Sequence, residues 1–147
     1  MFKHILVPTD GSPLSHNAAV KAVALAKAIG AHITALHVAP AYKVQLHDDY
    51  VPHDYQLPAD YAESMAQKCE PHLDEVKKLA RGSGVECTGR IAMSDFPADA
   101  IIKAVDKYGC DAIVMGSHGR SGLNKLLLGS ETQKVLESTT IPVLVTH

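Results

Sequence analysis

The chain has 147 residues, a length that suits one domain with a core large enough to fold by itself. Hydrophobic residues make up 46% of it, charged residues 20%, and the formal net charge is −2, so we expect no nucleic-acid partner. Its apolar runs are too short to span a bilayer, and we expect no membrane partner either.

The cysteines indicate the compartment. Cys69, Cys87 and Cys110 are odd in number and widely spaced, without a C-x-x-C pair, which is typical of reduced thiols packed as small hydrophobes. The first residues also lack the longer apolar run and the small-residue cleavage site of a signal peptide. We therefore expect a cytoplasmic protein.

The chain begins with a predicted strand, a helix and a second strand. Residues 3–8 are apolar and β-branched up to a turn, as in a strand. Ser12 is a good N-cap and Pro13 suits the first helical position, and the helix should stop at Gly30. Residues 32–39 predict the second strand. The expected inner face of the helix consists of Leu14, Ala18, Ala22, Leu25 and Ile29.

A long excursion and a second helix follow. Residues 40–58 contain three prolines and show no sustained period, which favours a long functional or mobile loop. The helix should end at residues 82–84 ("GSG"), and Pro71 should kink or break it. Its expected inner face consists of Ala62, Met65, Cys69, Leu73, Val76 and Ala80.

The second half continues the alternation of strands and helices. We expect strands over residues 85–93, 112–115 and 141–146, and a helix over 130–138. Asp95 and Pro97 should open another helix that ends at Gly109. The expected inner face of that helix consists of Ala98, Ile101, Ile102 and Val105.

This alternation predicts an α/β fold: an open parallel five-stranded sheet, in the order 3-2-1-4-5, with helices on both faces. Ligands of such sheets bind outside the carboxyl ends of the strands, where the strand order reverses. Residues 8–12 and 116–130 should therefore line one crevice. The last strand should lie at an edge of the sheet, where two copies could pair about a two-fold axis, and we expect a homodimer through it.

The segment 116–130, "GSHGRSGLNKLLLGS", has the character of a phosphate-binding loop. Its four glycines let the backbone approach a ligand closely, and it leads into the N-terminus of a helix, which attracts anions. Arg120 and Lys125 add positive charge, with no acid in the segment. Neither G-x-x-x-x-G-K-[ST] nor a G-x-G-x-x-G after a strand occurs, so the familiar phosphate-loop signatures do not apply.

The spacing G-x2-G-x9-G-S, formed by Gly116, Gly119, Gly129 and Ser130, resembles the ATP-binding motif of the universal stress protein family. The opening "ILVPTDGS", the run "DAIVMGSHGRSGLNKLLLGS" and the ending "PVLV" are similar to that family as well. The resemblance covers the whole chain. It implies one Rossmann-like universal stress protein domain over residues 1–147 that dimerises and binds ATP, as a nucleotide-binding module in stress response.

The resemblance also implies a set of site residues. Pro8, Thr9 and Asp10 would hold the adenosine end, with the Val38 backbone at the base. Met115 and Gly116 would lie under the ribose. The residues expected around the phosphates are Gly119, Arg120, Gly129, Ser130 and Glu131, helped by Thr132.

Glu131 departs from this pattern, because a neutral residue is expected beside phosphates. A carboxylate there suits the helix dipole but repels the ligand unless a cation intervenes. We therefore expect Mg²⁺ or Mn²⁺ bound through the phosphates.

Other interpretations of single residues stay open. Ser130 with Gln133 fits an S-x-x-Q capping box, and the same hydroxyl could serve as cap and phosphate ligand. Asp10 could be a turn residue in "TDG". His118 is expected to contact ligand, with a solvated side chain as the alternative, and His37 is expected in the core.

The segment 47–54, "HDDYVPHD", contains residues that ligate metals, but nothing fixes their geometry, and a solvated loop is the better interpretation. The sequence shows no dedicated general base, so at most slow ATP hydrolysis is expected. Two alternatives to a binding module remain: a nucleotide hydrolase or nucleotidyl-transferring enzyme of the same fold, and an interaction protein without nucleotide.

Overall fold

The structure, a computed structural model, describes residues 1–43, 56–119 and 128–147. Its strands are β1 (His4–Pro8), β2 (His32–Ala39), β3 (Cys87–Met93), β4 (Ala112–Gly116) and β5 (Val143–Thr146). Its helices are α1 (Pro13–Ile29), α2 (Pro58–Gly82), α3 (Pro97–Tyr108) and α4 (Ser130–Ser138). Arg120, Lys125, the segment 47–54 and most of the expected long loop over 40–58 fall outside the described residues.

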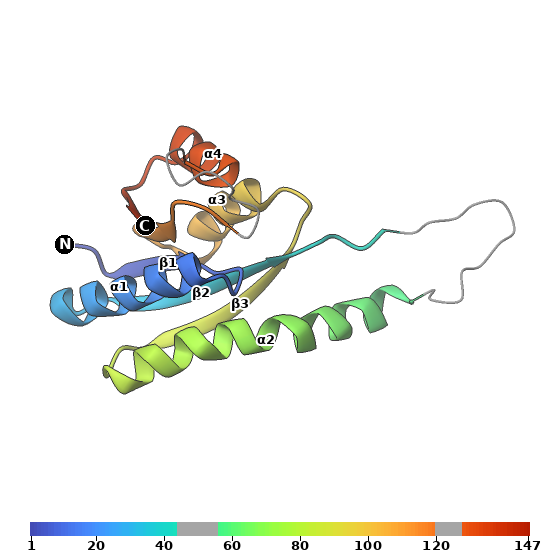
Figure 1. Ribbon diagram of the computed structural model, residues 1–147, viewed down its shortest axis with the longest axis horizontal. Helices are drawn as coiled ribbons and strands as arrows, with labels where there is room; N and C mark the ends of the chain where they lie inside the picture. Colours follow the sequence, from blue (N-terminus) through green and yellow to red (C-terminus); the bar gives the residue numbers. More distant parts are fainter. Residues whose placement is uncertain (44–55, 120–127) are drawn as a thin grey trace, which may run out of the picture.

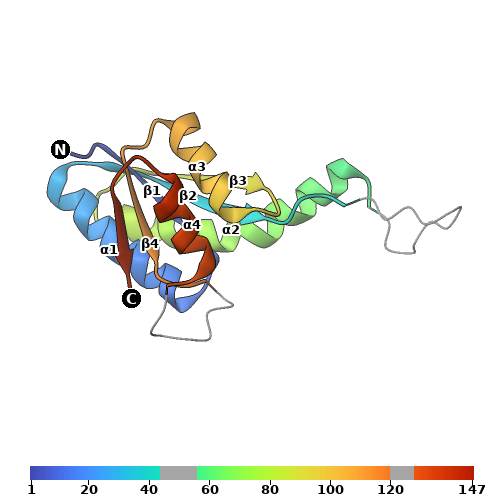
Figure 2. The ribbon, with the colours of Figure 1, turned by 90° about the horizontal axis from the view of Figure 1, so that it is seen from above.

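The five strands form one parallel sheet in the order β3-β2-β1-β4-β5. The predicted fold class and strand order are thus confirmed. The helices cover both faces of the sheet, with α1 and α2 on one side and α3 and α4 on the other (Figures 1 and 2). Strand ends differ from the predicted ones by one or two residues, the usual uncertainty at element boundaries.

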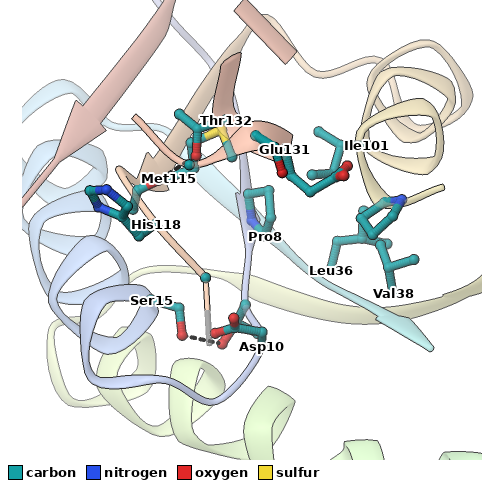
Figure 3. Close-up of a pocket in the computed structure, with 16 residues that line it drawn as sticks. Pro8, Asp10, Ser15, Leu36, Val38, Ile101, Met115, His118, Glu131 and Thr132 are labelled. Carbon is teal, nitrogen blue, oxygen red and sulfur yellow. Dashed lines mark hydrogen bonds between the residues drawn. The ribbon is translucent and has the colours of Figure 1, made fainter. Parts of the chain in front are cut away.

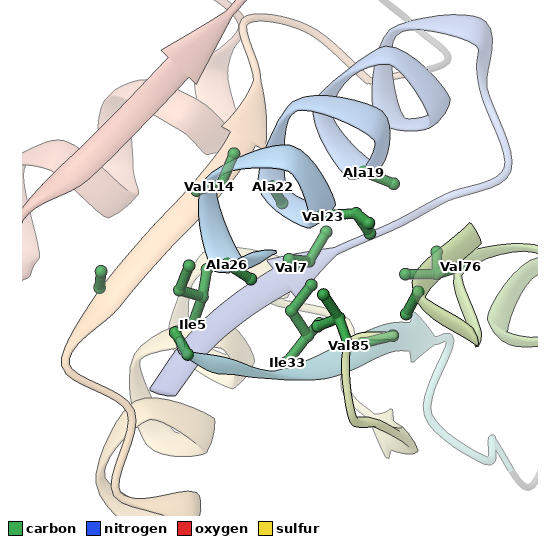
Figure 4. Packing of buried hydrophobic residues seen from close by; sticks show 14 of the residues in the cluster. Ile5, Val7, Ala19, Ala22, Val23, Ala26, Ile33, Val76, Val85 and Val114 are labelled. Carbon is green, nitrogen blue, oxygen red and sulfur yellow. The ribbon is translucent and has the colours of Figure 1, made fainter. Parts of the chain in front are cut away.

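Strand alternation divides the core into two layers. Ile5 and Val7 of β1 point toward α1 and α2, where they pack with Ile33 and Val114 of the neighbouring strands (Figure 4). Leu6, between them, points to the opposite face and joins the layer under α3 and α4. β1 is therefore buried on both faces, as a central parallel strand must be.

The buried face of α1 differs from the prediction. It consists of small residues, and the larger Leu14, Leu25 and Ile29 are only half-buried along its flanks. Small side chains let the helix axis lie close to the sheet, and longer ones then fit better at the margins of the contact. The buried residues are Ser15, Ala18, Ala19, Ala22, Val23 and Ala26.

Helix α2 runs through Pro71, so of the expected kink or break the break does not occur. Pro71 and Gln67, whose carbonyl loses its helical partner, are both exposed, so water can satisfy that carbonyl. The first turns of α2 extend beyond the sheet (Figures 1 and 2), and its buried residues begin only at Cys69. Ala62 is exposed, so the predicted inner face holds only for the second half of the helix.

Candidate functional site

A cavity of about 410 Å³ opens at the carboxyl ends of β1, β2 and β4, between these strands and the first turns of α3 and α4. It lies where the strand order reverses, since β1 has β2 on one side and β4 on the other. Its lining residues are Pro8, Thr9, Asp10, Ser15, Leu36, Val38, Pro97, Ile101, Met115, Gly116, His118, Gly119, Gly129, Ser130, Glu131 and Thr132.

Every predicted site residue that the structure describes lines this cavity. Arg120, the remaining one, falls outside the described residues. Four lining residues were missed: Ser15, Leu36, Pro97 and Ile101. Leu36 shares a strand face with Val38 two residues later, so alternation could have found it. Ser15, Pro97 and Ile101 carry no local signal and reach the cavity only through the fold.

One wall of the cavity is apolar. Leu36 and Val38 come from β2, Met115 from β4 and Ile101 from α3, all in the core layer under α3 and α4. In Figure 3 the Leu36, Val38 and Ile101 side chains lie close together on one side of the view. Such a wall suits a flat apolar group such as a heterocyclic base.

The loop between β1 and α1 forms the floor. Asp10 Oδ1 accepts a hydrogen bond from the Ser12 backbone N–H at 2.9 Å, so Asp10 is a turn residue as well as a lining residue. The Thr9 and Ser15 hydroxyls hydrogen-bond to each other, with 3.2 Å between the oxygens (Figure 3). The two interpretations of Asp10 are therefore compatible.

Gly119 allows this loop and the segment after β4 to meet. A Cβ at Gly119 would lie 2.9 Å from Asp10 Oδ2, too close without a shift of that carboxylate. The predicted juxtaposition of residues 8–12 with the glycine-containing segment is thus present in the fold. At the end of β4, a Cβ on Gly116 would likewise lie 3.3 Å from the Leu14 carbonyl oxygen.

The N-terminus of α4 borders the cavity, and no side chain in the described part of the chain caps it. Its N-cap is Gly129, whose backbone is extended (φ −62°, ψ 150°) and whose N–H donates to the Ser117 carbonyl at 2.7 Å. Ser130 is the first helical residue and is exposed, so the predicted S-x-x-Q capping box is wrong. Gln133 instead donates to Glu137. A first helical turn without a cap keeps N–H groups that can bind an anion.

Thr132 fixes this turn to the sheet. Its side chain is 3% exposed, and its hydroxyl donates to the Gly116 carbonyl at 3.0 Å. The hydroxyl thus joins α4 to the end of β4. The sequence predicts that Thr132 helps around the phosphates, and this bond gives it an indirect role there, the placement of the helix end.

His118 lies apart from the apolar wall, on the other side of the view in Figure 3. Its Nδ1 is 2.9 Å from the Ser117 hydroxyl, and within the described ranges its Nε2 is buried without a hydrogen-bond partner. His37, expected in the core, is half-buried outside the cavity, and its ring stacks on that of His72 with centroids 5.3 Å apart.

The charges on the described walls are the carboxylates of Asp10 and Glu131, with no Lys or Arg among these lining residues. The attraction for an anion within this part of the chain therefore comes from the N-terminus of α4. The Glu131 carboxylate also interacts with groups outside the N-terminus of α4. Its Oε2 accepts from the Ala98 N–H at 2.9 Å and its Oε1 from Lys134 at 3.1 Å.

No described group of three or more His, Cys, Asp or Glu residues could hold a metal ion. Among the helices that the structure describes, none combines the length and apolar character that a membrane crossing requires.

Comparison with known proteins agrees with the fold. The sequence profile of the universal stress protein family matches residues 1–147. The universal stress protein MJ0531 of Methanocaldococcus jannaschii is 33% identical over 99% of this chain and 82% of its own length. The solved structure of MJ0577, from the same organism, superposes with a TM-score of 0.82 at 27% identity, covering 99% of this chain and 96% of that one.

Two further solved structures contain a nucleotide. A universal stress protein in complex with cAMP has a TM-score of 0.75 at 22% identity, over 99% of this chain and 97% of its own. The universal stress protein of Archaeoglobus fulgidus in complex with dAMP has a TM-score of 0.67 at 20% identity, over 97% and 96%. At these identities the likeness concerns the fold. The match of the family profile to the full chain and the identity to MJ0531 show that this chain belongs to the universal stress protein family.

Proposed function

We propose that this chain binds an adenine nucleotide, with ATP as the preferred ligand, and acts in stress response as a nucleotide-binding module. The observation that carries the proposal is the pairing, in one cavity, of an apolar wall with the N-terminus of α4, which no side chain of residues 1–43, 56–119 or 128–147 caps. A base requires the first feature and phosphates require the second. The cAMP and dAMP complexes of two family members support the choice of adenine.

The proposed assignment follows the geometry of the walls. Pro8, Val38 and Met115 would contact the adenosine part, and Thr9 and Asp10 would close its floor. Gly116 would lie beneath the ribose. The phosphates would lie against Gly119, Gly129 and Ser130, near His118, with Arg120 added from the sequence pattern.

Mg²⁺ or Mn²⁺ would enter bound to the phosphates. The carboxylates of Asp10 and Glu131 already accept hydrogen bonds from protein donors, so the described walls offer no ready carboxylate cage for a cation. A metal that keeps its water and phosphate ligands fits this donor set better than one held by the protein alone.

Calorimetry with ATP, AMP and adenosine tests the proposal. We expect ATP to bind at least tenfold more tightly than adenosine in dilute buffer, and the gap to narrow as salt screens the phosphate charges. Turnover of ATP with Mg²⁺ should stay far below ~1 s⁻¹, a common lower value for enzymes. Absence of binding by all three ligands would overturn the proposal.

Gently purified protein offers an independent check. The chain contains no tryptophan and five tyrosines, so its own absorbance is weak and bound nucleotide would raise the 260/280 ratio visibly. Mass spectrometry of the released ligand should identify an adenine nucleotide.

We also propose a cytoplasmic location for this protein. The free thiols of Cys69, Cys87 and Cys110 support it.

We further propose that the chain forms a homodimer through β5. This strand is at the end of the sheet, next to β4, and Leu144 is 47% exposed on it. An apolar edge strand is well suited to pair about a two-fold axis. Light scattering at micromolar concentration should give a dimer, and Leu144→Lys should give a monomer. A monomeric wild-type protein would contradict this assembly.

A further inference from the structure

Helix α3 begins without a cap of its own. Its N-cap residue is Phe96, which has no side-chain acceptor, and Pro97 takes the first helical position. The nearby Ser94 hydroxyl is already occupied, because it accepts from the Phe96 N–H at 3.0 Å and donates to the Phe96 carbonyl at 3.3 Å. The Ala98 N–H is thus one of the donors that a helix start leaves for an outside partner.

That partner comes from the other side of the cavity. Glu131 is separated from Ala98 by 33 residues in the sequence, and its Oε2 lies 2.9 Å from the Ala98 nitrogen. In Figure 3 its side chain extends from α4 toward Ile101 of α3. Lys134, one turn further along α4, binds the second oxygen at 3.1 Å. Both carboxylate oxygens therefore have protein donors.

The position also explains why a carboxylate is tolerated at this site. Glu131 lies in the first turn of α4 and bonds to the first turn of α3, so it interacts with the positive ends of two helix dipoles. The ion pair with Lys134 offsets part of the negative charge of the Glu131 carboxylate. The sequence predicts that this carboxylate repels the phosphates unless a cation intervenes, and the two protein donors reduce that repulsion.

We propose that Glu131 is a positioning residue: it caps α3 from α4 and thereby holds the cavity wall that carries Pro97 and Ile101. The inference builds on the proposed nucleotide function and gives Glu131 a role at the adenosine side. Removing the carboxylate should loosen the first turn of α3, and Pro97 and Ile101 would lose their fixed distance from Leu36 and Val38.

Adenosine separates this role from simple repulsion of phosphates, because adenosine carries no charge. Calorimetry would compare Glu131→Ala, Glu131→Gln and, as the matched control, Lys134→Ala, which removes the ion pair and keeps the cap. We expect Glu131→Ala to lower the affinity for adenosine at least threefold. Glu131→Gln keeps an oxygen acceptor and should stay within twofold of wild type, as should Lys134→Ala. Unchanged adenosine binding in Glu131→Ala, or an equal loss in Glu131→Gln, would overturn the proposal.

Amide hydrogen exchange followed by NMR on the ligand-free protein tests the cap itself. The Ala98 N–H should exchange at least tenfold faster in Glu131→Ala than in wild type, and less than threefold faster in Glu131→Gln. An Ala98 amide that is unprotected in the wild-type protein would overturn the proposal. If wild type binds no adenosine, the proposed function fails, and the exchange data still decide whether Glu131 caps α3.

Discussion

Helices α1 and α4 both begin at the cavity, after the neighbouring strands β1 and β4, yet their N-termini are capped differently. At α1 the Ser12 side chain accepts from the Ser15 N–H at 3.2 Å, and Pro13 removes another donor. At α4 the N-cap is Gly129, which has no side chain to fold back on the first turn. The comparison shows that the N-cap residue decides whether a helix end can be closed by its own side chain.

Helix α3 is an intermediate case. Its own N-cap residue cannot accept a hydrogen bond, and Glu131 supplies the acceptor from α4. As far as the described residues show, the end of α1 is closed locally, that of α3 is closed from a distance, and that of α4 is left open. Among these three, the open end is the one best suited to phosphates.

Closing the open end with charge should give the largest effect. Ser130→Asp puts a carboxylate on the first helical position of α4, beside the expected phosphates. We predict that ATP binding falls at least tenfold, about 1.4 kcal/mol or more, by like-charge repulsion. Adenosine binding should change less than twofold.

Ser130→Asn, nearly isosteric with the aspartate, is the control and should bind ATP within threefold of wild type. The melting temperature of Ser130→Asp should stay level or rise slightly, since an acid suits a helix N-terminus. Calorimetry and thermal melts measure both quantities. An equal loss of ATP and adenosine would place Ser130 away from the phosphates.

Opening the closed end should affect stability instead. Ser12→Ala removes the cap of α1 and should lower the free energy of unfolding by about 1 kcal/mol, or roughly 3 °C in melting temperature. Because Ser12 is 7% exposed and is not a lining residue, ATP affinity should change less than threefold. Denaturant unfolding and calorimetry give the two numbers. A large loss of affinity with unchanged stability would reverse the roles we give to these helix ends.

The fold followed from local patterns because each strand and helix carries its own period. Apolar strands separated by helices require a parallel sheet with both faces covered, and the loops after β1 and β4 then have to meet. The placement of Pro8, Asp10 and Gly129 on one cavity can be predicted from the sequence for this reason.

Features that depend on packing or on partners distant in the sequence could not be predicted from local sequence patterns. The S-x-x-Q pattern cannot distinguish Ser130 at the N-cap from Ser130 one position inside the helix, and the bond from Gly129 to Ser117 decides between them. The buried face of α1 was shifted because the largest apolar residues do not mark the closest approach to the sheet. The cap that Glu131 provides joins residues 33 positions apart, with no local signal at all.

The smallest effect is expected at the far end of β1, away from the cavity. Burial, and then the neighbouring His32, lower the pKa of His4 below its ordinary 6.5, although Asp111 acts in the opposite direction. As the pH falls through about 6.5, His4 therefore binds a proton in the unfolded chain, while in the folded chain it binds one only at lower pH. Stability should be level above that pH and decline as the pH falls below it.

His4→Gln removes this titration and can keep a hydrogen bond to Thr34, which His4 Nε2 contacts at 2.7 Å. Unfolding free energies measured between pH 5 and 7.5 should decline less steeply for the variant than for wild type. ATP affinity at pH 7 should be the same for both proteins. Parallel pH profiles would show that His4 does not contribute to the acid sensitivity.

The central claim is that phosphates bind at the uncapped end of α4 while the end of α1 stays closed. Backbone amide NMR during titration with ATP and with adenosine tests it most directly. The amides of Ser130, Glu131 and Thr132 should shift strongly with ATP and little with adenosine, and those of Ser15 and His16 should shift little with either. Equal shifts for both ligands at Ser130 and Glu131, or larger phosphate-dependent shifts at Ser15, would contradict the account.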